Sequence, residues 1–152
     1  MRRVLAIVGC VVASALAGCS SGDDIGRTVP VRGRVTYEGN PLGTGVVIFR
    51  PDVHKGNTGG NEARGTIDAE GYYKLSTGTG PKPKEGVPPG WYQVGVVSLK
   101  EPAERPKDLR GGMPPPLESF IPQKYSDPAT SGLSVEVTEN PESGAYDLKL
   151  NR

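Results

Sequence analysis

The chain has 152 residues and a formal net charge of +1, from 18 Lys and Arg against 17 Asp and Glu. This balance excludes the basic field that recruits nucleic acid and the acidic field that gathers cations, so we expect no nucleic-acid partner. The 22 Gly and 15 Pro favour short strands and turns, because both residues interrupt helices.

The N-terminus has the pattern of a signal peptide. Arg2 and Arg3 precede an apolar stretch, 4–16, that has the length of a secretory h-region. A membrane-spanning helix needs about 20 apolar residues, and this stretch is shorter and is followed by the polar run Ser-Ser-Gly-Asp-Asp at 20–24. We therefore expect residues 1–18 to be cleaved and not to remain as a transmembrane anchor.

The four residues Leu16-Ala17-Gly18-Cys19 resemble the lipobox of bacterial lipoproteins. This resemblance implies signal cleavage between Gly18 and Cys19 and acylation of the Cys19 thiol, with palmitate-like chains. Each buried methylene contributes about 0.8 kcal/mol, so two or three chains hold a protein on a membrane that it does not span. The alternative is an ordinary secretory signal that contains a chance cysteine.

An exported lipoprotein is expected in the cell envelope or periplasm, with the leaflet left open. Ser20 after Cys19 slightly favours the outer over the inner membrane, because Asp at that position favours inner-membrane retention in some bacteria. Cys10 leaves with the signal and Cys19 is acylated, so the domain has no thiol for a disulfide, a thiolate metal site or a cysteine nucleophile. We expect a flexible tether over 19–28 and one domain over 29–152.

Seven segments of the domain have strand patterns, either period-two alternation or a short β-branched run. They are 29–37, 46–49, 63–67, 72–75, 91–97, 133–137 and 145–150. Turns at 68–71 and 140–144 predict two hairpins, and 76–89 and 99–119 are expected to be loops. No segment has a helical period that would carry a parallel crossover. The sequence therefore predicts an all-β, seven-stranded, mostly antiparallel β-sandwich.

The same alternation predicts which side chains form the core. The expected inward residues are Val31, Val35, Val46, Ile48, Ile67, Tyr73, Leu75, Tyr92, Val94, Val96, Leu133, Val135, Val137, Tyr146, Leu148 and Leu150.

The order of several sequence phrases along the chain resembles a known family. The phrases are VRGRVTY at 31–37, GNPL at 39–42, VVIFRP at 46–51, DAEGYYKL at 68–75, PGWYQV at 89–94 and IPQKYSDPATSGL at 121–133. Together they resemble the carboxypeptidase regulatory-like domain, of transthyretin-like or Ig-like sandwich fold, and the last phrase resembles a stretch of small bacterial lipoproteins that carry it. The resemblance implies a fold and an accessory role, and it carries no family-wide catalytic residue.

The side chains that bear chemistry do not complete a catalytic or metal site in the sequence. A hydrolase triad needs a base beside its nucleophile, and His54 is the one histidine. Transthyretin-like hydroxyisourate hydrolases use several histidines and a Tyr-Arg-Gly-Ser ending, whereas this chain ends Asp-Leu-Lys-Leu-Asn-Arg. One histidine and no free cysteine exclude a zinc shell. Asp68 and Glu70 beside Gly71 are weak calcium candidates, although hairpin geometry also explains them.

Two aromatic rings are candidate contacts for a partner. Tyr72 and Trp91 fall on the strand face opposite Tyr73 and Tyr92, where an exposed ring can stack on a glycan or a protein. The sequence therefore predicts a non-catalytic, lipid-anchored envelope lipoprotein without a cofactor, whose domain contacts an envelope protein or glycan. The rival prediction is a hydrolase or metal-dependent enzyme that uses the loops 51–62 and 76–90, with His54 and Asp68 as its candidates.

Overall fold

The computed structural model describes residues 25–100 and 117–152. The predicted signal peptide, 1–18, and the predicted lipidation site at Gly18 and Cys19 lie outside these residues. The described residues form ten strands, two short 3₁₀-helices (η) and no α-helix. The elements are β1 Arg32–Tyr37, β2 Asn40–Pro41, β3 Gly45–Pro51, η1 Val53–Lys55, β4 Ala63–Ile67, β5 Tyr72–Lys74, β6 Ser76–Thr77, β7 Lys84–Glu85, β8 Gly90–Val97, η2 Gln123–Ser126, β9 Leu133–Val137 and β10 Leu148–Leu150.

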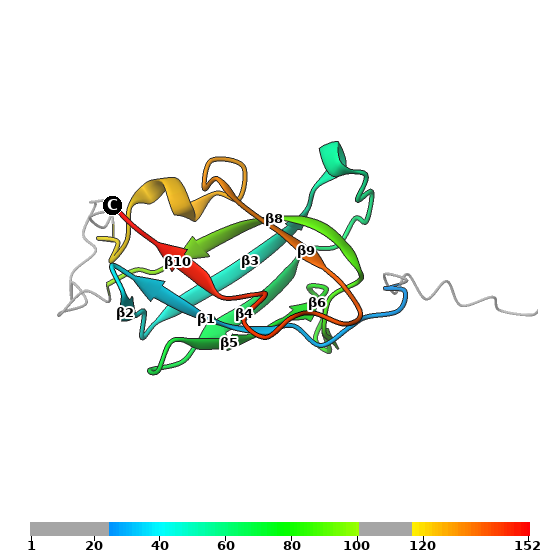
Figure 1. Ribbon diagram of the computed structural model, residues 1–152, viewed down its shortest axis with the longest axis horizontal. Helices are drawn as coiled ribbons and strands as arrows, with labels where there is room; N and C mark the ends of the chain where they lie inside the picture. Colours follow the sequence, from blue (N-terminus) through cyan, green and yellow to red (C-terminus); the bar gives the residue numbers. More distant parts are fainter. Residues whose placement is uncertain (1–24, 101–116) are drawn as a thin grey trace, which may run out of the picture.

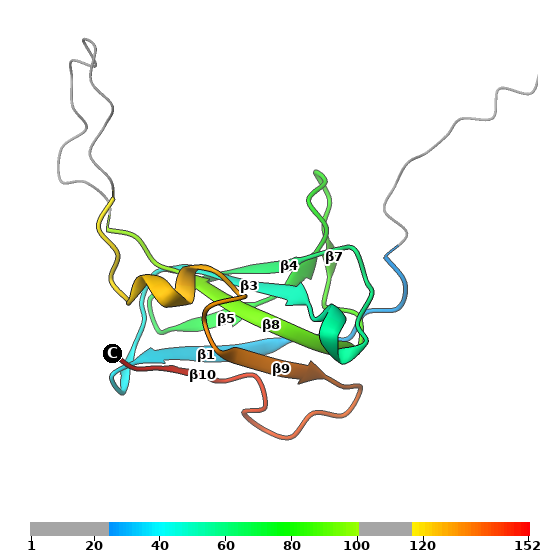
Figure 2. The same cartoon turned by 90° about the horizontal axis from the view of Figure 1, so that it is seen from above.

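The strands form one continuous sheet in the order β10-β1-β5-β4-β3-β8-β9. β2 extends β1, and the β6–β7 hairpin extends β4. Every strand pair is antiparallel except β1 with β10, which are parallel. The sheet is strongly curled, like half a barrel, so β1, β9 and β10 lie along one side and β3 and β4 along the other (Figures 1 and 2). The prediction of an all-β, mostly antiparallel fold is confirmed.

The predicted strand positions agree with the structure in the middle of the domain and differ at its end. The first hairpin is confirmed: β4 and β5 flank the turn at 68–71, where Gly71 has a φ of 88°. The second hairpin is wrong, since β9 pairs with β8 whereas β10 pairs with β1. The loop predicted over 76–89 contains β6 and β7, because two-residue strands between Gly and Pro leave no period to detect.

The core of the curled sheet is built from inward side chains of nearly every strand. In β3 the prediction is wrong by one residue: Val47 and Phe49 are fully buried, whereas Val46 and Ile48 lie half-buried on the outer face. Four consecutive apolar residues have no alternation that would decide their faces. Leu133 and Val135 are also only partly buried. Core residues that were not predicted, besides Val47 and Phe49, are Val29, Leu42, Ala63, Val87, Ile121 and Tyr125.

Tyrosine hydroxyls connect the ends of the curled sheet. The buried Tyr73 hydroxyl donates to the carbonyl of Tyr146 at 2.6 Å. The Tyr146 hydroxyl in turn accepts from the Thr138 amide at 3.3 Å and donates to its carbonyl at 3.4 Å. Gly33 packs against the same point, since a Cβ there would lie 2.2 Å from the Tyr146 carbonyl oxygen. Through Tyr146, these contacts connect β1 and β5 to Thr138 at the end of β9.

Candidate functional site

The candidate site is a row of polar side chains on the outer face of the sheet. Arg50 of β3 lies opposite Gln93 of β8, and Gln93 lies opposite Ser134 of β9. These side chains point away from the core because Phe49 and Val94, their neighbours in sequence, point inward. Three adjacent strands therefore present polar groups to the same surface.

One end of this row opens into a shallow groove of about 470 Å³, which we call the Arg50 groove. Its polar lining comes from β3, β8 and the loop that connects β3 to β4. Its polar side chains are those of Arg50, Asp52, His54, Glu62 and Gln93. On the loop side the groove is lined by Gly59 and Gly60, which have no side chains.

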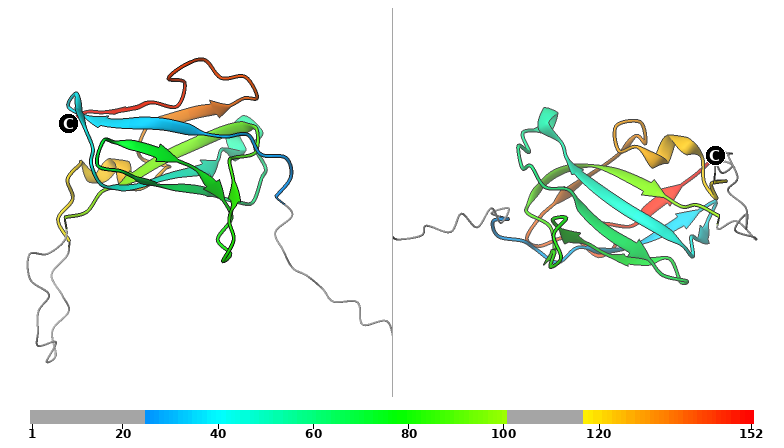
Figure 3. Two further views of the ribbon diagram at one scale, coloured as in Figure 1. Left: turned by 90° about the horizontal axis from the view of Figure 1, so that it is seen from below. Right: turned by 180° about the vertical axis from the view of Figure 1, so that it is seen from behind.

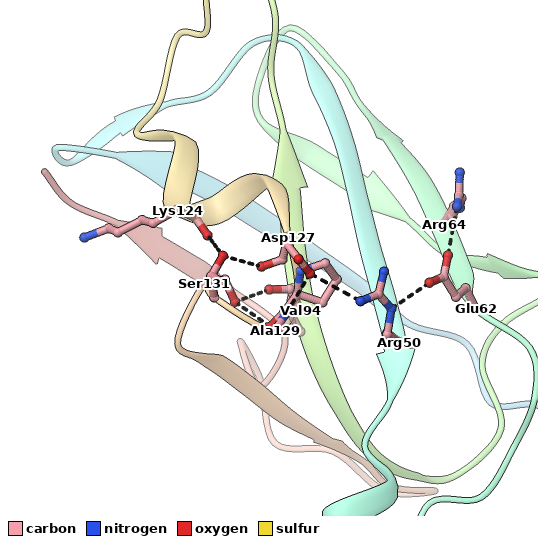
Figure 4. Close-up of polar contacts among 10 residues, drawn as sticks. Arg50, Glu62, Arg64, Val94, Lys124, Asp127, Ala129 and Ser131 are labelled. Atoms are coloured by element: carbon pink, nitrogen blue, oxygen red, sulfur yellow. Dashed lines mark hydrogen bonds and ion pairs between the residues drawn. The ribbon is translucent and has the colours of Figure 1, made fainter.

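Two arginines and two carboxylates form an ion-pair network beside the groove (Figure 4). The Nε of Arg50 lies 2.9 Å from Oε1 of Glu62, and its Nη1 lies 3.2 Å from Oδ1 of Asp127. The Nη2 of Arg64 lies 2.8 Å from Oε2 of Glu62. The hydrogen bonds from Arg50 and then Arg64 hold the pKa of Glu62 below its ordinary value, and the bond to Glu62 raises the pKa of Arg50. Both shifts favour the charged forms of Arg50 and Glu62.

A turn at 127–131 fixes Asp127 in position. Its Oδ1 also accepts from the Ala129 amide at 2.9 Å, as in an Asx-turn. Pro128 is buried against β8, where a Cβ on Gly95 would lie only 2.8 Å from the proline ring. The buried Ser131 hydroxyl donates to the Val94 carbonyl. The carboxylate that pairs with Arg50 is thus held by backbone and side-chain contacts to β8.

The loop on the other side of the groove is organised by Asp52. This residue is only 5% exposed, and its Oδ1 accepts from the His54 amide at 3.1 Å. Its carbonyl accepts from the amides of Lys55 and Asn57. The His54 side chain is exposed and makes no hydrogen bond with the described residues.

Trp91 lies at the end of the polar row, and its ring is covered by a lysine. The Lys55 Nζ lies 3.9 Å from the ring centroid and donates to the Ser134 hydroxyl at 2.8 Å. The Asn57 amide donates to the Trp91 carbonyl at 2.8 Å. Such a cation–π contact competes with a ligand for the ring face.

Tyr72 lies in a different hollow from Trp91. Its side chain is 53% exposed, and the Arg34 guanidinium carbon lies 5.2 Å from its ring centroid. Its hollow is lined also by Thr66 and Lys74. The two aromatic residues predicted as partner contacts therefore do not form one platform.

Asp68 and Glu70 serve the β4–β5 turn. Oδ1 of Asp68 accepts from the amides of Glu70 at 3.1 Å and Tyr72 at 2.7 Å. The Glu70 carbonyl accepts from Nε of Arg34 at 3.1 Å. In the part of the chain that the structure describes, no group of three or more His, Cys, Asp and Glu side chains is arranged to hold a metal ion.

Comparisons with known proteins add no relative: no family model matches the chain, and no curated protein or solved structure matches it significantly. Between residues 25 and 100 and between 117 and 152, no helix is long and apolar enough to cross a membrane.

The ion-pair network was not predicted from the sequence. Arg50, Glu62 and Asp127 are far apart in the chain, and charged residues outside a motif usually indicate only a solvated surface. The contact between Arg50 and Glu62 could have been predicted from the pairing of β3 with β4. Phe49 lies opposite Ala63, which places the next residue of β3 beside the residue before β4. Nothing in the sequence indicated that Asp127 returns to this pair.

Proposed function

We propose that this protein is a non-catalytic lipoprotein of the cell envelope, anchored through Cys19, whose domain binds another envelope component at the Arg50 groove. The observation that carries the proposal is the network of Arg50, Glu62 and Asp127 beside that groove. Binding sites commonly contain a few charged or polar groups in fixed positions. Such groups contribute mainly to the specificity of binding and less to its affinity.

The charges of the groove favour a polar partner without a large charge of its own. Arg50 is paired with two carboxylates, and Gln93 adds an amide that both donates and accepts. A polyanion would meet Glu62 and Asp127, and a polycation would meet Arg50. Hydroxyl and amide groups of a glycan or of an envelope protein match this mixture of donors and acceptors.

We also propose that the curled sheet is a two-layer sandwich of the carboxypeptidase regulatory-like type. Two points support this assignment. The sequence phrases between 31 and 94 resemble those of that family in their order, and the Phe49 ring packs with the rings of Tyr73 and Tyr92, at centroid distances of 6.5 and 5.8 Å. A core shared by β3, β5 and β8 is what two facing layers require.

The groove is tested by photocrosslinking in intact cells. A photoreactive amino acid replaces Gln93 in the groove or, as the control, Lys149, an exposed residue of β10. We expect a discrete crosslinked product from position 93 only, and we expect Arg50→Glu to reduce it at least fivefold. Equal products from both positions, or none from position 93, would contradict binding at this groove.

The anchor is tested separately by Cys19→Ala. This variant should leave the signal uncleaved or release the protein from membranes, and a membrane-bound, acyl-labelled product would contradict the lipid anchor. The rival enzymatic proposal is tested with His54→Ala and Asp68→Ala. It loses its best candidates if both variants keep every activity measured for the unaltered protein.

A further inference from the structure

The segment that leads to Cys19 is joined to the domain at Ile25. Ile25 is the first described residue, and only five residues separate it from Cys19. An extended chain spans at most about 3.5 Å per residue, so the two Cα atoms are no more than about 20 Å apart in any conformation. β8 alone, at about 3.4 Å per residue over eight residues, is longer than this reach. The end of the domain that holds Ile25 therefore stays close to any lipid on Cys19.

The β6–β7 hairpin holds the residues that follow Ile25. The Lys84 Nζ donates to the carbonyls of Ile25 at 2.9 Å and Gly26 at 2.7 Å. The Thr28 hydroxyl donates to the Glu85 carbonyl at 2.8 Å. Val29 and Val87 then exchange two backbone hydrogen bonds of 2.9 Å. Figure 3 shows the blue segment that begins at residue 25 at the base of this hairpin, which projects from the sheet.

The hairpin carries positive charge toward the surface. Lys82 and Lys84 are both exposed, and neither forms an ion pair with a described residue. Lys84 bonds carbonyls, which carry no opposite charge, and Glu85 is paired with Lys74 at 2.7 Å. Residues 20–24 contain Asp23 and Asp24 and no cationic residue. Arg27, which follows Ile25, is paired with Glu139 at 2.7 Å, so the lysines without an ion pair at this end come from the hairpin.

We propose that the β6–β7 hairpin, 76–85, faces the bilayer that holds Cys19 and that Lys82 and Lys84 contact its anionic headgroups. This inference rests on the lipid anchor of the proposed function. The occupant is a lipid surface because the short link brings this end of the domain to within about 20 Å of the acylated residue. Lysines that reach anionic headgroups gain about fivefold in partitioning each, and this attraction falls off within a Debye length.

The test uses fluorescence quenching of single-tryptophan variants in vesicles. Trp91 is the sole tryptophan of the chain, so Trp91→Phe provides a silent background. Thr79→Trp places the reporter at the hairpin tip, and Asn40→Trp places the control at the first residue of β2, beside the C-terminal end of β1. The full-length protein, purified with its lipid, is reconstituted into vesicles that contain phosphatidylglycerol and a phosphatidylcholine with a nitroxide on its headgroup.

We expect at least threefold stronger quenching from the Thr79→Trp reporter than from the Asn40→Trp reporter. Lys82→Gln, 0.5 M salt or vesicles of phosphatidylcholine alone should reduce this difference. Lys82 makes no side-chain hydrogen bond with the described residues, so its variant tests charge without loosening the Ile25 segment. Equal quenching of both reporters, stronger quenching of the Asn40→Trp reporter, or no effect of Lys82→Gln would overturn the proposal.

Failure of the anchor can be distinguished from failure of the hairpin contact. If the purified protein carries no acyl chain on Cys19, the lipid-anchor proposal fails by that result alone. Coupling Cys19 to a maleimide lipid in the same vesicles then supplies an attachment at the same residue. The two reporters are compared again, with the same outcomes for and against the hairpin contact.

Discussion

Replacing Gly33 with alanine should strongly destabilise the protein, although the change adds one methyl group. A Cβ at this position would lie 2.2 Å from the Tyr146 carbonyl oxygen and 2.9 Å from the Tyr73 hydroxyl. Real contacts of this kind are longer than about 3 Å, so Tyr146 must move by nearly 1 Å. That carbonyl is the acceptor for the buried Tyr73 hydroxyl at 2.6 Å.

The expected cost combines one lost hydrogen bond with the overpacking by the added methyl group. Leaving a buried hydroxyl without its partner costs about 1 to 3 kcal/mol, and overpacking costs a similar amount. Alanine recovers about 0.4 to 1 kcal/mol by restricting the unfolded chain. We therefore expect a loss of about 2 to 4 kcal/mol in the free energy of unfolding, a large fraction of the total for one domain.

Urea denaturation, followed by the fluorescence of Trp91, measures this loss. Gly60→Ala is the matched control, because nothing lies within 4 Å of a Cβ at Gly60 and its φ is not in the left-handed region. The control should be neutral or slightly stabilising. A Gly33→Ala protein within about 0.5 kcal/mol of the unaltered protein would show that the close approach of β1 to Tyr146 does not exist.

Three further predictions concern polar groups. The hydrogen bond from Arg50 lowers the pKa of Glu62 below 4.5, its ordinary value. The stability that this pair contributes is therefore present above pH 4.5 and is lost as the pH falls through the pKa of Glu62 in the folded state. Glu62→Gln should therefore cost up to about 1 kcal/mol near neutral pH, because Arg50 is half exposed, and less near pH 3 in urea titrations. Burial raises the Tyr73 pKa, so stability falls above about pH 10. Tyr73→Phe should weaken that decline and cost about 1 to 2 kcal/mol. Ser131→Ala should cost a similar amount in the same assay, since its buried hydroxyl bonds the Val94 carbonyl; an unchanged midpoint would contradict that bond.

The sequence predicted the elements whose patterns are local. β4 and β9 occupy the predicted residues, because each alternates cleanly with period two. The β4–β5 hairpin was also predictable, since Asp68 and Gly71 have well-defined uses in turns. β3 was placed correctly, but its inward residues were not, because a run of four apolar residues contains no information about faces.

The partners of the last strand depend on non-local geometry. From sequence, β9 and β10 look like neighbours around a turn, yet the curled sheet brings β1 beside β10. The same limitation applies to the Arg50 groove, where Asp127 reaches Arg50 only because Pro128 packs on Gly95. Residue types alone suggested Asp68, Tyr72 and Trp91, each of which already has a partner within the fold.

The parallel pairing of β1 with β10 has a consequence for how the protein is made. Val35 and Tyr37 pair with Leu148 and Leu150, so nearly the whole chain separates the partners. Ribosomal synthesis delivers β1 first and β10 last. Until the final residues emerge, β1 has an open edge and the nascent chain remains a substrate for chaperones and proteases. Contacts of such high sequence separation slow folding, and loss of only the last five residues would leave the first strand permanently unpaired on that side.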